Sequence, residues 1–190
     1  RVLFRSTRPT STTTQPIKTT TKPVVTNGTS VCQCGTTGGP KIVGGTNVAE
    51  GEIPWQVGLG YGVAGAFNTF CGGTLIGPNY VVSAAHCLEI SDLDVLVIMG
   101  TINRMSPTAT LVGIDTITPH EKYDSMNDDN DILVLKLKSS VTYTSNVFPA
   151  CLPRRLTSET FDGKDLVVSG WGRTTPGTPS SPNLLMKATV

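Results

Sequence analysis

The strongest constraint on the fold is the way that apolar segments are interrupted. From Lys41 onward, short apolar runs are separated by Gly, Pro, Asn and Asp, at intervals typical of antiparallel β structure. No segment of useful length competes with the 3.6-residue period of an amphipathic helix. The sequence therefore predicts an all-β sandwich or barrel. The expected strands cover residues 55–59, 73–76, 80–84, 95–99, 110–117, 132–137, 166–169 and 184–190.

The first 31 residues have a different composition from the rest. They contain ten Thr, three Ser and three Pro, and their only charges are five basic residues. So few apolar side chains cannot offset the entropy of ordering the backbone, so residues 1–31 are predicted to be a disordered linker or propeptide. Such a composition suits O-glycosylation, although an unmodified spacer is equally compatible. Asn27 begins the chain's only N-glycosylation sequon.

Charge and hydropathy exclude several classes of protein. The net charge is +1, and removing the five basic residues of 1–31 leaves 10 basic and 14 acidic residues, a net of −4. This balance argues against a nucleic-acid partner. The longest apolar runs, such as residues 95–99, are far shorter than the roughly 18 residues that span a bilayer, so no membrane association is expected.

Five cysteines indicate the compartment. They stand at 32, 34, 71, 87 and 151, and neither a C-x-x-C pair nor a nearby histidine cluster suggests a zinc site. Disulfides are the better interpretation, and they imply an oxidising, extracytosolic environment. The odd count, a first residue that is not Met and an end within an apolar run lead us to expect an internal fragment of a longer chain.

Only two histidines are available as a catalytic base, His86 and His120. His86 follows a predicted strand and precedes Cys87, so a disulfide there would hold its imidazole in place. Taken alone, a histidine in this position is more often structural. Asp131 precedes an apolar strand, where a carboxylate is costly to bury unless a donor such as an imidazole N–H satisfies it. The acids beside Asp131 could instead form a solvated turn or a calcium site, although the glycine and distal glutamate of an EF-hand are missing.

Four short segments of the chain are informative when taken together. They are Lys41-Ile42-Val43-Gly44-Gly45, Ala84-Ala85-His86-Cys87, Asp129-Asn130-Asp131-Ile132-Leu133 and Ser169-Gly170-Trp171-Gly172. Each is weak alone, but in this order the four resemble one known family, the trypsin and chymotrypsin serine proteases. The resemblance implies two β-barrels side by side, of which this chain would hold the first, roughly residues 42–150, and the opening strands of the second. An apolar face between the barrels would be left uncovered.

The resemblance assigns roles to individual residues. His86 would be the general base and Asp131 the buried acid that fixes its tautomer. His120 would be an ordinary surface histidine. Cleavage between Lys41 and Ile42 would activate a zymogen, the new amino group of Ile42 pairing with a carboxylate and ordering the substrate pocket.

The resemblance also implies disulfides and domain limits. Cys71 would pair with Cys87, and Cys151 with Cys34, leaving Cys32; the choice between Cys32 and Cys34 stays open. The implied organisation is a linker at 1–31, an activation segment at 32–41 and a partial protease domain at 42–190. The resemblance calls for neither a metal nor a cofactor.

The family's nucleophile segment, Gly-Asp-Ser-Gly-Gly, does not occur in the 190 residues. We therefore expect the 190-residue polypeptide alone to be inactive, and we expect the whole protein to be a secreted trypsin-like endopeptidase. Its expected partners are protein or peptide substrates, an activating trypsin-like protease and protein protease inhibitors. Two alternatives remain, a catalytically inactive homologue that serves as a binding or cofactor module and an unrelated disulfide-bonded β adhesion domain.

Overall fold

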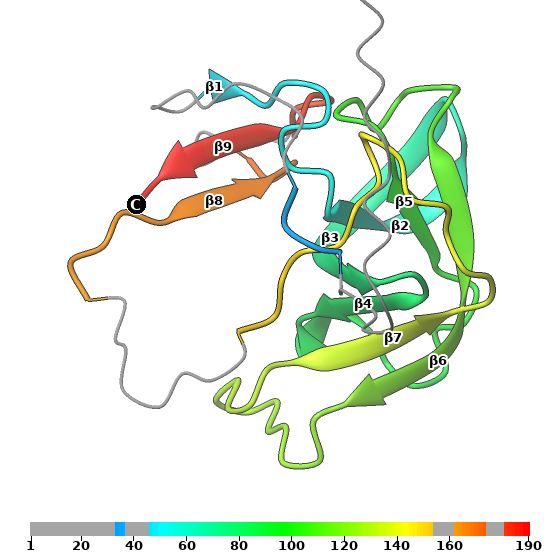
Figure 1. The fold of residues 1–190 in the computed structure, drawn as a ribbon. Coiled ribbons are helices and arrows are strands. Elements are labelled where there is room, and N and C mark those ends of the chain that lie inside the picture. The colour runs from blue at the N-terminus through cyan, green and yellow to red at the C-terminus, as the bar shows by residue number, and fades with distance from the viewer. Residues whose placement is uncertain (1–32, 37–45, 154–161, 174–180) are drawn as a thin grey trace, which may run out of the picture. The chain divides into compact units, whose positions relative to one another are not determined.

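The computed structural model describes residues 33–36, 46–153, 162–173 and 181–190, which form nine strands and one short helix (Figure 1). No helix in these ranges is long and apolar enough to cross a bilayer. The elements are β1 Thr46–Asn47, β2 Gln56–Val63, β3 Ala66–Gly77, β4 Tyr80–Ser83, the 3₁₀ helix η1 Ala85–Cys87, β5 Leu96–Met99, β6 Thr110–Pro119, β7 Leu133–Leu137, β8 Val167–Gly170 and β9 Met186–Thr189.

Six antiparallel strands close into a barrel in the order β2-β3-β4-β7-β6-β5, with β5 pairing back onto β2. Strand β7 shows why these sequences form barrel walls. Its residues 133, 135 and 137 are buried leucines, whereas Val134 and Lys136 between them are exposed, as the two-residue period of a strand requires. The buried leucines join a core that includes Val57, Leu59 and Ile114. The all-β prediction and the first closed barrel are confirmed.

The remaining strands form a three-stranded sheet in the order β1-β9-β8. The sequence analysis did not predict strand β1, which pairs with β9 and lies outside the first barrel. Thr46 pairs with Lys187 and Asn47 with Met186, and Val48 continues the contact by donating its N–H to the carbonyl of Leu185 at 2.9 Å. Val48 then packs with Leu185 and Trp171 in a second buried cluster, so its burial draws β1 to this sheet.

The eight expected strands all occur, but β2 and β3 are longer than expected. They form a hairpin of 8 and 12 residues. The sequence underestimates it because Gly60, Gly62 and Gly65 interrupt the apolar pattern, and glycine usually weakens a strand. The strands predicted at 80–84 and 132–137 are each one residue too long, because Ala84 is the N-cap of η1 and Ile132 comes before the first residue of β7.

Gly60 is required by the close approach of β2 and β3. A Cβ atom at this position would lie 2.0 Å from the carbonyl oxygen of Asn68. We therefore expect Gly60→Ala to lower the free energy of unfolding by about 1–3 kcal/mol, since backbone must move to relieve the overlap. Denaturant unfolding would measure this loss. Gly172→Ala is the matched control, because a Cβ at Gly172 meets nothing within 4 Å; equal losses in both variants would contradict the steric argument.

Candidate active site

The pairing of β4 with β7 brings His86 and Asp131 together at one end of the barrel. Ser83, at the end of β4, pairs with Leu133, at the start of β7. His86 lies in η1, directly after β4, and Asp131 lies two residues before β7. His86 and Asp131 are 45 positions apart in the chain, and the pairing of β4 with β7 is what brings them together.

His86 occupies both oxygens of the Asp131 carboxylate. Its Nδ1 lies 2.7 Å from Oδ2, and its backbone N–H donates to Oδ1 at 2.9 Å. Because a carboxylate can only accept, Nδ1 must carry the proton of this bond. The other ring nitrogen, Nε2, is then left with a free lone pair in the neutral imidazole. This is the arrangement that a general base needs.

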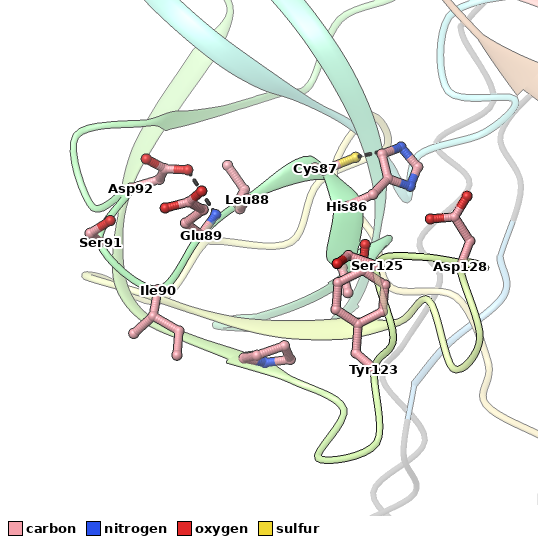
Figure 2. Close-up of a pocket in the computed structure, with 12 residues that line it drawn as sticks. His86, Cys87, Leu88, Glu89, Ile90, Ser91, Asp92, Tyr123, Ser125 and Asp128 are labelled. Carbon is pink, nitrogen blue, oxygen red and sulfur yellow. Dashed lines mark hydrogen bonds between the residues drawn. The ribbon is translucent and has the colours of Figure 1, made fainter.

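The surroundings of Nε2 leave it open to a reacting group. The imidazole side chain is 56% exposed. Nε2 lies 3.6 Å from Cys87 Sγ, but this sulfur is in a disulfide and has no hydrogen to donate (Figure 2). Among the described residues, no serine hydroxyl is hydrogen-bonded to this nitrogen.

Asp131 is less buried than expected. Its side chain is 22% exposed, because it precedes β7 at the rim of the barrel and does not lie within the core. The pKa of Asp131 is nevertheless lowered from its ordinary value of 3.8. The hydrogen bond from the His86 side chain is the largest cause, followed by the bond from the His86 backbone, and both outweigh partial burial, which acts in the opposite direction.

This lowered pKa predicts a measurable pH dependence of stability. The folded protein binds a proton at Asp131 less readily than the unfolded chain does, so the stabilisation is complete above the ordinary value of 3.8 and is lost as the pH falls through the lower folded-state pKa. The stability difference between the wild type and Asp131→Asn should therefore shrink between pH 5 and pH 2. Urea unfolding across that range measures it. Asp162→Asn, at an exposed position, is the control, and a difference that stays constant with pH would contradict the prediction.

The neighbouring sequence candidates lie on the surface. Asp128 and Asp129 are exposed, and so is His120, whose Nδ1 accepts the backbone N–H of Lys122 at 3.2 Å. Asp128 and Asn130 both have positive φ angles, of 53° and 58°, which turn the chain immediately before Asp131. Asp and Asn tolerate this left-handed conformation better than most residues do.

Two disulfides fix the segments around the site. Cys71 is bonded to Cys87, next to His86, and Cys34 is bonded to Cys151. These are the pairings that the family resemblance implied, and Cys32 lies outside the described residues. The one described group of His, Cys, Asp and Glu side chains close enough to share a metal ion is Cys71, His86 and Cys87. Both of its sulfurs are used by the disulfide, so it does not offer a metal site.

An open depression of about 1170 Å³ lies beside His86. The segment 85–92 forms one side and residues from 119 to 128 form the other (Figure 2). Tyr123 and Asp128 stand on the side opposite the loop that carries Glu89 and Ile90. His86, the candidate base, thus lines an open concave surface.

The remaining predicted positions cannot be placed. Asn27, Lys41 and Ile42 lie outside the described residues.

The sequence analysis missed a buried ion pair, in which Lys187 Nζ on β9 donates to Glu52 Oε1. The second carboxylate oxygen accepts the backbone N–H of Ala49 at 3.0 Å. Charged residues are usually exposed, and nothing in the sequence marks these two as partners.

A closed six-stranded barrel with a His–Asp pair at its rim, followed by the beginning of a second sheet, is the architecture of the double-barrel serine proteases. The family model described as Trypsin matches residues 42–190. The chain belongs to the trypsin family.

Individual relatives agree with this assignment. Trypsin from Sus scrofa is 37% identical over 79% of this chain and 62% of its own length. Venom serine protease 34 from Apis mellifera is 34% identical over 75% of this chain and 37% of its own length. Among solved structures, one described as the structure of GrC superposes with a TM-score of 0.66 at 30% identity, covering 78% of this chain and 64% of that one. The chain thus spans less than two thirds of the length of these relatives.

Proposed function

We propose that the protein to which this chain belongs is a secreted, trypsin-like serine endopeptidase made as a zymogen. Within it, residues 1–31 are a linker or propeptide, 32–41 the activation segment and 42–190 part of the protease domain. The observation that carries the proposal is the pair of hydrogen bonds from His86 to Asp131, in a chain of the trypsin family. A serine in a part of the whole protein beyond these 190 residues would supply the nucleophile.

In this proposal His86 acts through its free Nε2. It takes the proton of the serine hydroxyl as that oxygen attacks the peptide carbonyl carbon, and returns the proton to the leaving amine. Asp131 keeps the proton of the imidazole on Nδ1 and stabilises the imidazolium ion that forms. Water then hydrolyses the acyl-enzyme. An inactive homologue has no chemical need for both side chains, so their pairing favours the enzyme.

Cleavage after Lys41 is the proposed switch. The test is to treat the full-length protein with immobilised trypsin, to remove that trypsin, and then to add a fluorescent diphenyl phosphonate, which labels active serine hydrolases. We expect labelling and peptide-amide hydrolysis only after a new amino terminus at Ile42 appears. Lys41→Gln should abolish both, whereas Lys122→Gln, at an exposed lysine elsewhere, should not. A correctly cleaved wild type without labelling would establish the inactive homologue instead.

Secretion and glycosylation at Asn27 form a separate part of the proposal. Two disulfides within the described residues support an oxidising compartment. The full-length protein expressed in cells should be recovered from the medium and should shift to lower mass on treatment with an N-glycosidase. Asn27→Gln should remove that shift, and a protein found only in reduced form inside the cell would contradict the assignment.

A further inference from the structure

The β2–β3 hairpin exposes aromatic side chains that the proposed chemistry does not use. Tyr61 on β2 is 47% exposed and Phe70 on β3 is 46% exposed. Their ring centroids lie 5.7 Å apart, so the two rings form one continuous apolar surface. Isolated exposed apolar residues are common, but adjoining exposed aromatics are characteristic of surfaces that bind a partner.

A β-bulge exposes Phe70. Leu59 pairs with Cys71, but the next residue, Gly60, pairs with Thr69, which leaves Phe70 as an extra residue on β3. Bulges redirect side chains and often lie near functional sites. The exposure of the ring therefore follows from the backbone of the hairpin. Phe70 also precedes Cys71, whose disulfide to Cys87 adjoins His86.

Acidic side chains border this aromatic surface. Gly60 pairs with Leu96 of β5, so the turn before β5 lies beside Tyr61. Burial raises the pKa of the Tyr61 hydroxyl, and the charges of Asp94 and Asp92 in this neighbouring turn raise it further. The turn itself, residues 88–95, contains three acidic residues and no basic one.

Arg104 is hydrogen-bonded to the β2–β3 hairpin, but it does not neutralise the negative charge of Asp92 and Asp94. Arg104 donates to the Thr69 hydroxyl at 3.3 Å, but it also donates to the carbonyl of Ser181 at 3.1 Å and to the side chain of Asn183 at 3.2 Å. Its guanidinium is therefore directed toward the segment that precedes β9. Among the described residues, no basic side chain forms an ion pair with Asp92 or Asp94, although Asp92 Oδ2 accepts the Glu89 N–H at 2.8 Å, so the negative charge of both can attract an external cation.

We propose that Tyr61, Phe70, Asp92 and Asp94 form a docking surface, the aromatic–acidic patch, for a segment of a protein substrate rich in basic and apolar residues. Lysine or arginine stems pack on the two rings, their charged ends lie over the Tyr61 face or beside the carboxylates, and apolar neighbours cover Phe70. That the partner is a substrate rests on the proposed protease function. Because Phe70 adjoins Cys71 and its disulfide to Cys87, the patch would hold a part of the substrate chain that flanks the bond to be cut.

Direct binding tests the patch without requiring catalysis. The full-length protein carrying His86→Ala would be titrated with a fluorescein-labelled dodecapeptide of alternating Lys and Leu, followed by fluorescence anisotropy. We expect Kd to rise at least about tenfold in Tyr61→Ser and in the double variant Asp92→Asn, Asp94→Asn, and binding to weaken with salt. Asn at 92 keeps an acceptor oxygen for the Glu89 N–H that Asp92 binds at 2.8 Å.

Matched controls come from the opposite part of the barrel wall. Tyr80 on β4 is 42% exposed, and Asp115 on β6 is an exposed acid, so Tyr80→Ser and Asp115→Asn repeat both changes outside the patch. These controls should bind like the parent protein. Equal affinity across all variants, or equal affinity for a peptide of alternating Glu and Leu, would overturn the proposal.

A second measurement separates the patch from the protease assignment. In the activated protein with His86 intact, Tyr61→Ser should leave hydrolysis of a tripeptide amide within about twofold, but should slow cleavage of a protein bearing the Lys-Leu segment about tenfold. If the parent protein hydrolyses no amide, the protease assignment fails while the binding data still decide the patch. If both substrates slow equally, the patch is wrong and the protease assignment stands.

Discussion

Replacing His86 with alanine in the activated full-length protein is expected to lower kcat for a peptide amide by about 10⁶-fold. Removal of the base from a triad of this kind costs about as much as removal of the whole triad, because the residues act as a unit. The His86 side chain is 56% exposed and is held by two bonds to Asp131, and the other histidine, His120, is an exposed residue bonded to Lys122.

The size of the loss in kcat distinguishes a catalytic role of His86 from a purely structural one. The imidazole is 56% exposed, so its removal should lower stability only through the lost side-chain bond to Asp131, an effect far smaller than the loss of activity. His120→Ala is the matched control, since His120 is also exposed and adjoins the turn that leads to Asp131. Steady-state kinetics on both variants would measure the effect. An activity for His86→Ala within tenfold of the parent would show that another group is the base.

Lys187→Met is expected to lower the free energy of unfolding by about 3–5 kcal/mol, the cost of leaving a buried charge without its partner. The side chains of Lys187 and Glu52 are only 5% and 10% exposed. Burial alone would raise the pKa of Glu52, but the hydrogen bonds from Lys187 and Ala49 and the charge of Lys187 lower it from its ordinary value. Without Lys187, Glu52 would have to take up a proton or admit water.

A double variant tests the reason for this loss. Glu52→Leu together with Lys187→Met removes both charges and should recover most of the stability, because a buried ion pair is often no more stable than apolar residues of similar volume. Lys136→Met breaks the exposed pair between Lys136 and Asp115 and should change stability little. Denaturant unfolding of all variants gives the comparison. A double variant as unstable as Lys187→Met would mean that lost packing is responsible.

The sequence alone predicted the type of fold because strand formation depends on local pattern. The strand at 132–137 was predicted from a short apolar run that follows the acidic segment 128–131, and this run is visible without any structure. The identity of the candidate base also came early, since the chain has only two histidines. The place of β1 could not be predicted in the same way, because two residues have no period and Val48 is drawn to a cluster formed by Leu185 and Trp171.

The family resemblance paired His86 with Asp131, but only the tertiary structure shows how the register between β4 and β7 brings them together. The ion pair of Lys187 with Glu52 joins residues 135 positions apart, and nothing in the sequence indicated it. The exposure of Phe70 depends on a bulge between β2 and β3. Alternation along one strand reports which face is buried, but strand register and burial of charge depend on packing between segments that are far apart in the chain.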